Sequence, residues 1–304
     1  MKTYAKITIG IPVYNSEKFI KKHIETLLTQ TFQNFSIIIS DNGSTDDTTR
    51  ICEEISNNDN RIMFYRHEEN KGAFWNFNFI INKATTEYFV MSAPDDLWSR
   101  NFLESNITNL DKNDKLVGSI GECSVFVRKF NSIKNYYDIE HLTNKIKFQY
   151  VHAVQGNLSQ KIKFFLMYNM GSQYYSVFRT KDIQFANFYK EEKNYGMWQS
   201  DFATILKILK NGDLSVTTDS FFHKEVSQTS KSIIQYMKKM GFKNSEILFS
   251  KLIFSNWFFN EFGRKIFFNN ISTILKLNLS WSRTIIGEIL RMIKRRIAGK
   301  EQYW

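Results

Sequence analysis

The first hundred residues alternate between short apolar runs and helical patterns, and this alternation limits the fold more than any other feature. Four apolar, β-branched or aromatic runs, each bounded by polar or turn-forming residues, predict buried strands at Ile7–Val13, Phe35–Ser40, Ile62–Tyr65 and Tyr88–Met91. Apolar residues at helical spacing between them predict a helix capped by Ser16, a second over 46–55 and a third from Gly72 to Lys83. Regular alternation of this kind predicts an α/β fold with a mainly parallel sheet flanked by helices.

The rest of the chain is less regular. We expect strands at Leu116–Phe126 and Gln173–Phe178 and a helix at Phe202–Leu209. No apolar run is long enough to cross a bilayer, and the N-terminus does not read as a secretory signal. The two cysteines have no metal-ligand spacing. A cytoplasmic location is therefore expected.

The positive charge of the chain is concentrated near its C-terminus. The 304 residues carry a net charge of +11, and residues 231–304 hold 14 basic and 4 acidic residues, a balance of +10. This change in charge predicts a catalytic domain over residues 1–230 and a basic, mostly helical region over 231–304. Within that region, Thr284–Ile297 has the pattern of an amphipathic helix on an anionic membrane surface. The alternative is a helix that packs on its own domain. No nucleic-acid motif accompanies the cations, so nucleic acid is not expected as a partner.

Polar residues follow three of the four predicted strands. Parallel sheets bind ligands beyond the carboxyl ends of their strands, so these polar groups are expected to meet in one site. No glycine-rich dinucleotide loop or P-loop is present. Adjacent carboxylates suit a hard divalent cation shared with phosphates, although Asp95 and Asp96 also suit a solvated turn or a helix cap. The polar groups are Tyr14 with Asn15, Asp41 with Asn42, and Asp95 with Asp96.

Four segments in order, together with Gln30-Thr31-Phe32, resemble the motifs of family 2 glycosyltransferases. They are ITIGIPVYN at residues 7–15, SDNGSTD at 40–46, NKG at 70–72 and APDDLW at 93–98. Members of this family use nucleotide sugars and have a GT-A fold. The resemblance implies a nucleoside-diphosphate sugar as donor. It is specific over residues 7–105 and weak beyond them.

The resemblance also implies a donor site. Its residues would be Pro12, Tyr14, Asn15, Asp41, Asn42, Lys71 and Asp96. In the family the position of Asn42 is commonly an aspartate that contacts the base. An Asn-Gly turn is the alternative role for Asn42, since Gly43 follows it.

Asp95 matches the metal-binding aspartate of the family, and the implied cofactor is Mg²⁺ or Mn²⁺. Many relatives have a carboxylate where this chain has Ala93, so we expect a metal held by few protein ligands. His223 follows a predicted strand and is a second metal-ligand candidate, although a lone histidine is more often structural.

Asp201 is the candidate base for an inverting transfer, because a carboxylate that faces the donor sugar can accept the proton of the acceptor hydroxyl. It resembles the acidic residue in the acceptor half of the family, and its alternative role is a helix N-cap. Trp198 in the same segment could stack on a sugar or fill the core.

These features predict a metal-assisted glycosyltransferase that acts on a glycan or polyprenyl-linked glycan acceptor of the bacterial surface, peripherally bound at the inner face of the membrane. Two alternatives stay open: a nucleotidyltransferase, and a catalytically silent protein that binds glycans or membranes.

Overall fold

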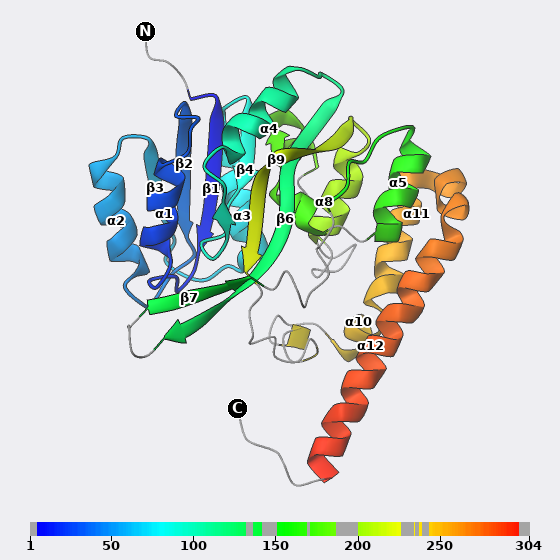
Figure 1. Ribbon diagram of the computed structural model, residues 1–304. Helices are drawn as coiled ribbons and strands as arrows, with labels where there is room; N and C mark the ends of the chain where they lie inside the picture. The colour runs from blue at the N-terminus through cyan, green and yellow to red at the C-terminus, as the bar shows by residue number, and fades with distance from the viewer. Residues whose placement is uncertain are drawn as a thin grey trace. The chain divides into compact units, whose positions relative to one another are not determined.

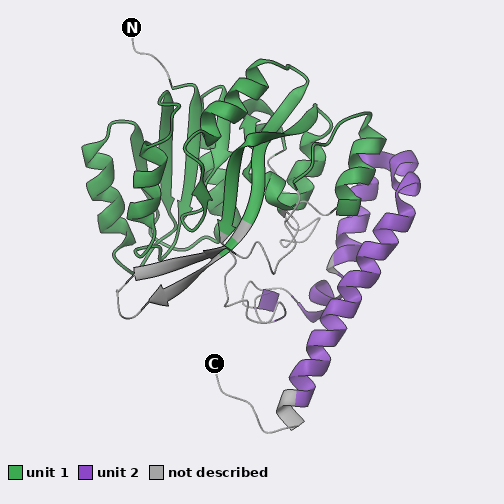
Figure 2. Cartoon of the chain, viewed as in Figure 1, with its two compact units in different colours: residues 1–189, 201–226 green, residues 190–200, 227–304 purple. Residues whose placement is uncertain are grey.

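The computed structural model describes residues 5–131, 136–141, 151–168, 171–186, 200–225, 234, 237–238 and 243–297. The chain divides into two compact units (Figure 2). Unit 1 comprises Met1–Tyr189 and Asp201–Val226, and unit 2 comprises Lys190–Ser200 and Ser227–Trp304. The assignment of catalysis to residues 1–230 and of membrane binding to 231–304 stays a prediction.

Unit 1 is built on a mixed sheet, which has nine strands among the residues that the structure describes (Figure 1). Its strand order is β3-β2-β1-β4-β8-β6-β9-β5, and β7 pairs with β6. The first four strands are parallel, as expected, and each of them lies within one residue of its predicted bounds: β1 (Ile7–Val13), β2 (Phe35–Asp41), β3 (Ile62–Arg66) and β4 (Tyr88–Met91). The added strands are β5 (Leu97–Trp98), β6 (Leu116–Asn131), β7 (Tyr136–His141), β8 (Val177–Arg179) and β9 (Asp213–Glu225).

The helices of unit 1 lie on both faces of this sheet (Figure 1). α1, α2 and α4 contribute apolar side chains to one face, and α3 packs against the other at β1 and β2. Their bounds are α1 (Ile20–Leu28), α2 (Thr48–Asn58), α3 (Ala73–Lys83), α4 (Phe102–Asp111), α5 (Leu158–Tyr168), α6 (Thr180–Phe185), α8 (Ser200–Ile208) and the 3-10 helix η1 (Gly171–Tyr175).

Two local predictions were wrong. Ser16 does not cap α1, which begins at Ile20; its backbone amide instead donates to Thr48 Oγ1 at 2.7 Å, and its carbonyl closes a turn. Residues 173–176 are not a strand. The side chain of Gln173 is buried and donates to the carbonyl of His152, while Ser176 folds back onto Gln173 in a turn, so β8 begins only at Val177.

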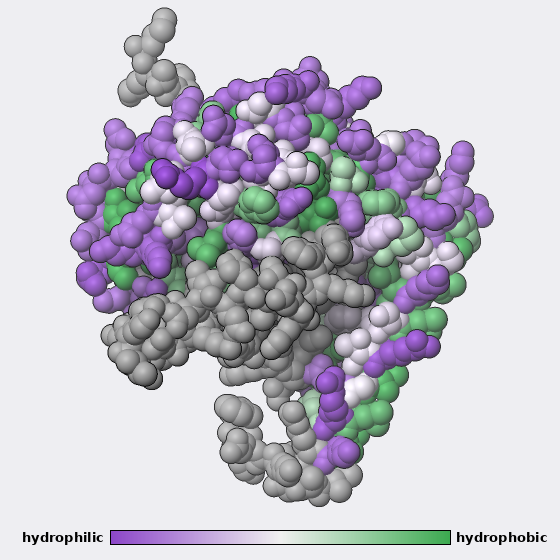
Figure 3. Space-filling model, viewed as in Figure 1, coloured by the Kyte–Doolittle hydropathy of each residue, from purple (hydrophilic) through white to green (hydrophobic). Residues whose placement is uncertain are grey.

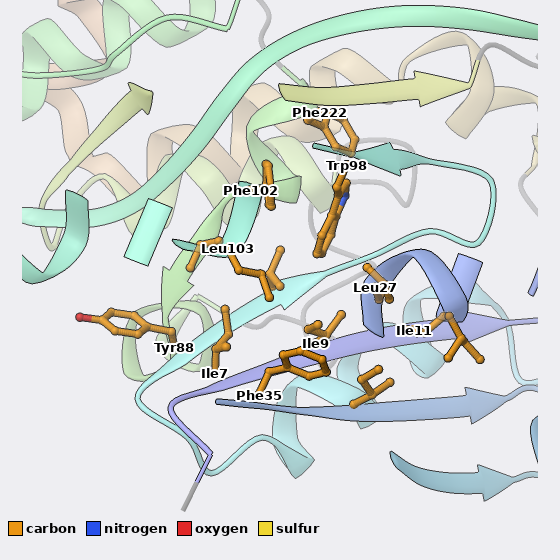
Figure 4. Packing of buried hydrophobic residues seen from close by; sticks show 14 of the residues in the cluster. Ile7, Ile9, Ile11, Leu27, Phe35, Tyr88, Trp98, Phe102, Leu103 and Phe222 are labelled. Atoms are coloured by element: carbon orange, nitrogen blue, oxygen red, sulfur yellow. The ribbon is translucent and has the colours of Figure 1, made fainter. Parts of the chain in front are cut away.

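The main core lies between β1, β2, β4 and the helices α1, α2 and α4 (Figure 4). Ile7, Ile9 and Ile11 of β1 are fully buried in it, with Leu27 from α1 and Phe102 from α4. Because strands at the centre of this sheet are covered on both faces, their sequences are continuously apolar rather than alternating. Both cysteines are buried and free, and burial raises the pKa of the Cys52 thiol to about 12.

Gly10 marks the closest approach of β1 to α3. A Cβ at this position would lie 2.4 Å from Cγ2 of Ile80 and 2.9 Å from the ring of Phe89. Glycine therefore permits the helix to pack directly on the strand.

Unit 2 is helical among its described residues. It contains α10 (Asn244–Leu248), α11 (Ser250–Asn269) and α12 (Ile271–Ile297), and α11 is kinked at Gly263, where φ is 77°. Ile247, Trp281 and Ile285 form a small core with Ile234 and Met237. None of the helices, so far as their residues are described, is both long and apolar enough to cross a bilayer.

We expect Gly10→Ala to destabilise the protein by about 1–3 kcal/mol, because the added methyl group overpacks the contact between β1 and α3. Urea denaturation followed by circular dichroism measures the change. Gly287→Ala in α12 is the control, since no heavy atom lies within 4 Å of its added Cβ. Equal midpoints for wild type and Gly10→Ala would show that the close approach is wrong.

Candidate active site

Asp41 organises the corner that follows β1 and β2. Its side chain is fully buried, and both carboxylate oxygens accept hydrogen bonds inside the protein. Oδ1 accepts from the amide of Ser44 at 3.0 Å and from its hydroxyl at 2.5 Å, and Oδ2 accepts from Thr49 Oγ1 at 2.6 Å. Asp41 therefore fixes the loop after β2 and the first turn of α2.

Asn42 joins this corner to the loop at residues 70–72. Its Nδ2 donates to Asn70 Oδ1 at 2.9 Å and to the carbonyl of Gly72 at 3.1 Å, and its Oδ1 accepts from the amide of Lys71 at 3.0 Å. Both amide hydrogens are thus engaged within the protein. The turn predicted as the alternative is also present, since Gly43 has φ 75° and a Cβ there would lie 2.8 Å from the backbone of Glu69.

The end of β1 lies beside the same corner. Pro12 pairs with Ser40 and Val13 with Asp41, so Tyr14 and Asn15 follow directly. Asn15 adopts a left-handed backbone with φ 52°, and its Oδ1 accepts from the amide of Thr45 at 2.9 Å. The ring of Tyr14 is 47% exposed. It is the aromatic surface at this edge on which a nucleobase could stack.

Lys71 brings a cation to this edge. Its Nζ lies 4.8 Å from the ring centroid of Trp75 in α3, within the range of a cation–π interaction. Its ammonium can serve a phosphate as a point charge.

Asp95 and Asp96 lie in the short loop between β4 and β5. The amide of Ser92 donates to the carbonyl of Gly10 at 2.8 Å, and the amide of Asp96 donates to the carbonyl of Ala93 at 3.1 Å, which closes a turn. Asp95 is half-buried and Asp96 is 2% exposed. Leu97 then pairs with His223 of β9.

His23 within α1 and Gln30 just after it hold this region in place. His23 contacts both ends of the Asp95 loop: its Nδ1 lies 3.2 Å from the carbonyl oxygen of Asp96, and its Nε2 lies 2.9 Å from Ser92 Oγ. Gln30 donates to the carbonyl of Ser99 at 2.9 Å and accepts from the amide of Leu103 at 3.1 Å. His23 was not among the residues predicted from sequence. The available signal was a polar residue on the buried face that Ile20, Ile24 and Leu27 define.

Asp201 lies in the first turn of α8. Its Oδ1 accepts from the amide of Phe202 at 2.8 Å. Its Oδ2 faces η1, since a Cβ at Gly171 would lie 3.6 Å from it. Asp201 is thus held close to Tyr174 and Tyr175 of η1. Trp198 lies outside the described residues.

The phenol of Tyr175 lies in the electrostatic field of the predicted carboxylates. Burial raises the pKa of its phenol well above the ordinary value, and the charges of Asp96, Asp95 and Asp201 raise that pKa further, as does Tyr174. Carboxylates from both halves of the predicted site, more than a hundred residues apart in sequence, thus act electrostatically on one phenol. Tyr175 was also missed from sequence.

The ring of Tyr175 is fixed by its neighbours. It stacks on Phe222 with a centroid distance of 5.2 Å, and the ammonium of Lys224 lies 5.2 Å from its centroid. Both neighbours belong to β9, the strand that also carries His223. Nδ1 of His223 lies 2.5 Å from Ser124 Oγ, so a metal-ligand role for this histidine would have to use Nε2.

The oxygen donors of this loop fit a divalent cation that is shared with a substrate. Asp95 and Asp96 supply hard carboxylate oxygens, which Mg²⁺ and Mn²⁺ prefer. Among the residues that the structure describes, no group of three or more acidic, histidine or cysteine side chains could hold a metal by itself. A cation here would therefore need phosphate oxygens or water to complete its coordination, which agrees with the absence of a carboxylate at Ala93.

Comparison with known proteins decides the family. A sequence model described as "Glycosyl transferase family 2" matches residues 8–173, more than half of the chain. The chain belongs to this family. The resemblance read from the four motifs is thereby confirmed, while Asp201 and His223 lie beyond the matched residues.

Several curated relatives of this family 2 glycosyltransferase are bacterial. Glycosyltransferase GlyG of Streptococcus pneumoniae serotype 4 is 33% identical over 108 residues, which cover 36% of each chain. An uncharacterized glycosyltransferase of Haemophilus influenzae is 30% identical over 151 residues, which cover 50% of this chain and 58% of that protein. The chain thus spans about a third of GlyG and somewhat more than half of the Haemophilus protein.

Solved glycosyltransferases share the GT-A fold of this chain. A crystal structure of S. aureus TarS aligns with 97% of the chain and 83% of its own, at a TM-score of 0.54 and 18% identity. The mannosyltransferase PcManGT from Pyrobaculum calidifontis, in complex with GDP-Man and Mn²⁺, covers 97% of this chain and 88% of its own at a TM-score of 0.52 and 13% identity. At these identities the comparison establishes the fold alone.

We expect Asn42→Asp to lower the free energy of unfolding by about 1–3 kcal/mol at pH 7. A carboxylate has no hydrogen to donate, so the bonds to Asn70 Oδ1 and to the carbonyl of Gly72 are lost, and Asn70 Oδ1 keeps the bond from the amide of Gly72. Urea denaturation measures the loss. Asn82→Asp on the exposed face of α3 is the matched control. If both variants are as stable as wild type, the bridging role of Asn42 is wrong.

Proposed function

We propose that this chain transfers a sugar from a nucleoside-diphosphate sugar to a polyprenyl-linked acceptor of a bacterial surface glycan. The observation that carries the proposal is the position of Asp95 and Asp96 in the loop at the carboxyl end of β4, where the amide of Ser92 is bonded to Gly10 of the neighbouring strand β1. Family membership supports the reaction class. A donor of this type is supported by TarS, solved in complex with UDP-GlcNAc, and by PcManGT with GDP-Man.

The donor nucleotide would lie along the edge formed by the ends of β1 and β2. Pro12, Tyr14 and Asn15 come from β1 and the residues after it, and Asp41 and Asn42 hold the opposite side of the corner. The exposed ring of Tyr14 is suited to stack on the base, and Lys71 is suited to contact a phosphate. Asp96 would contact the donor sugar or its diphosphate.

The proposed reaction is a direct displacement. Asp201 accepts the proton of the acceptor hydroxyl as that oxygen attacks the anomeric carbon, and the bond between this carbon and the diphosphate oxygen breaks on the opposite side. The anomeric configuration is therefore inverted. Asp95 would hold a divalent cation, with His223 as a second candidate ligand. When bound, the cation neutralises negative charge that develops on the departing diphosphate.

We expect Asp201→Asn to lower kcat by roughly 10²–10⁴-fold, because an amide cannot accept the proton. Asp95→Asn should lower Mn²⁺-dependent turnover by about a hundredfold or more. The assay offers a panel of nucleoside-diphosphate sugars with Mg²⁺ or Mn²⁺ and measures nucleotide release and mass gain on a lipid-linked acceptor. Asp114→Asn is the control, because it changes an exposed carboxylate at the other end of the sheet. Asp114 lies near Arg179, which pairs with Tyr88 at the amino end of β4, whereas Asp95 follows the carboxyl end of that strand.

The same assay separates the alternatives. Donor binding without turnover by any panel member would favour the catalytically silent protein. Diphosphate release from a nucleoside triphosphate would favour the nucleotidyltransferase. Full activity of Asp95→Asn would exclude the metal assignment.

We further propose that α12 holds the protein at the inner face of the cytoplasmic membrane. Ile274, Trp281 and Ile285 face the interior of unit 2, whereas a separate stripe of large aliphatic side chains on α12 is 40–60% exposed. The members of this stripe are Leu275, Leu279, Ile286, Ile289, Leu290 and Ile293. Figure 3 shows the hydrophobic edge of this helix beside hydrophilic side chains.

A row of basic residues runs along the helix beside this stripe. Lys276, Arg283 and Lys294 are separated by 7 and 11 residues, which places them in one row along a helix. An apolar stripe beside a row of cations is typical of helices that lie in the interface of anionic bilayers.

We expect Lys276→Gln/Arg283→Gln/Lys294→Gln to weaken binding to phosphatidylglycerol vesicles by about a hundredfold at low salt, at about 1 kcal/mol for each cation. Vesicle co-sedimentation of the full chain measures the effect. Lys18→Gln/Lys21→Gln/Lys22→Gln, which removes three exposed cations near α1, is the charge-matched control. If both triple variants weaken vesicle binding equally, the net charge of the protein, rather than α12, attracts it to the vesicles.

A further inference from the structure

His23 is a polar side chain in an apolar setting. It lies on the face of α1 that buries Ile20, Ile24 and Leu27, and it is only 4% exposed. A buried imidazole needs partners for its ring nitrogens, because an unsatisfied polar group in a core is costly. Each ring nitrogen has a partner in one short loop.

The two partners are the first and last residues of the loop that carries Asp95. Nε2 lies 2.9 Å from Ser92 Oγ, and Nδ1 lies 3.2 Å from the carbonyl oxygen of Asp96. A carbonyl oxygen only accepts, so the bond to Asp96 assigns the hydrogen to Nδ1. In the neutral ring, Nε2 then accepts from the hydroxyl of Ser92. One rigid ring therefore sets the separation of the two loop ends.

The remaining contacts of this loop make the role of His23 specific. Ser92 is also anchored to β1, through its amide and the carbonyl of Gly10. The backbone amide of Asp96 donates to the carbonyl of Ala93, within the loop itself. The hydrogen bond from the His23 imidazole, by contrast, joins the carbonyl of Asp96 to α1, which lies outside the loop. Asp95 is the residue immediately before this tie.

We propose that His23 is a positioning residue that holds the loop at residues 92–96 in the geometry with which Asp95 meets a divalent cation and the donor diphosphate. The inference rests on the proposed function of Asp95. A site whose supporting residues are fixed before the ligand arrives binds more tightly, because less conformational freedom is lost on binding.

Substitutions at His23 can separate the two hydrogen bonds. The side-chain amide of asparagine reaches the position of Nδ1, and that of glutamine extends toward the position of Nε2. His23→Asn should keep the bond to Asp96, His23→Gln should keep the contact with Ser92, and His23→Leu fills the space with neither. Ser92→Ala removes the second contact from the other side without changing the ring, so it should behave like His23→Asn.

The experiment measures loop order and ligand binding separately in the full chain. Hydrogen exchange over residues 92–98 of the metal-free protein reports on the loop, and calorimetry with UDP and GDP in the presence of Mn²⁺ reports on binding. We expect His23→Leu to speed exchange in this segment and to raise the Kd of the Mn²⁺-nucleotide complex at least tenfold. His23→Asn and Ser92→Ala should stay within about threefold of wild type, with His23→Gln between them and His23→Leu.

Each outcome decides the proposal. A folded His23→Leu variant with wild-type Kd overturns it, even if exchange is faster, because the histidine would then only support the core. If His23→Leu does not fold, the comparison of His23→Asn with His23→Gln decides: equal Kd values overturn the proposal. If wild type binds neither nucleotide with Mn²⁺, the proposed function fails and this inference fails with it. If wild type binds a nucleotide and the variants bind it with the same Kd, the inference alone fails.

Discussion

The burial of the Asp41 carboxylate is the constraint on which the architecture of the candidate site depends. A carboxylate removed from water must find hydrogen-bond donors within the protein. Asp41 finds them in Ser44 and Thr49, and this forces the chain to turn at once after β2 and to begin α2 beside it. The hydroxyl of Ser44 in turn accepts from the amide of Asn15, which brings the end of β1 to the same corner.

The network continues from this corner to the next loop. Asn42 extends it to residues 70–72, just before α3. Three loops that are far apart in the sequence are thus joined by hydrogen bonds among side chains and backbone. These hydrogen bonds within the protein organise this edge of the sheet.

The parallel half of the sheet could be predicted because its determinants are local. Each of the first four strands is a continuous apolar run bounded by polar or turn-forming residues, and the structure places them within one residue of the predicted bounds. The errors arose where tertiary contacts override local pattern. Residues 173–176 have the composition of a strand, yet the buried amide of Gln173 draws them into a turn. A two-residue strand such as β5 has no detectable periodicity, and only its pairing with β9 defines it.

The residues of the candidate site could likewise be predicted only in part. Asp41, Asn42, Asp95 and Asp96 could be located because they follow predicted strands, and parallel topology brings such ends together. The contributions of His23 and Tyr175 could not be read from the chain, since each depends on a partner that folding brings near. The hydrogen bonds of Asn42 illustrate a further limit. The sequence gives its position at the corner, but not that its amide would be engaged by residues 70–72.

The pairing of β5 with β9 has a consequence for the order in which the protein is completed. Leu97 and Trp98 pair only with His223 and Phe222, among the strands that the structure describes. During synthesis these two residues leave the ribosome more than a hundred residues before their partners. The first four strands contain their own pairings and can associate early, but the segment that follows Asp95 and Asp96 must wait for β9. Contacts of such long sequence separation form late and slowly. The nascent chain can therefore form the parallel half of its sheet well before the segment that follows residues 92–96 finds its partner strand.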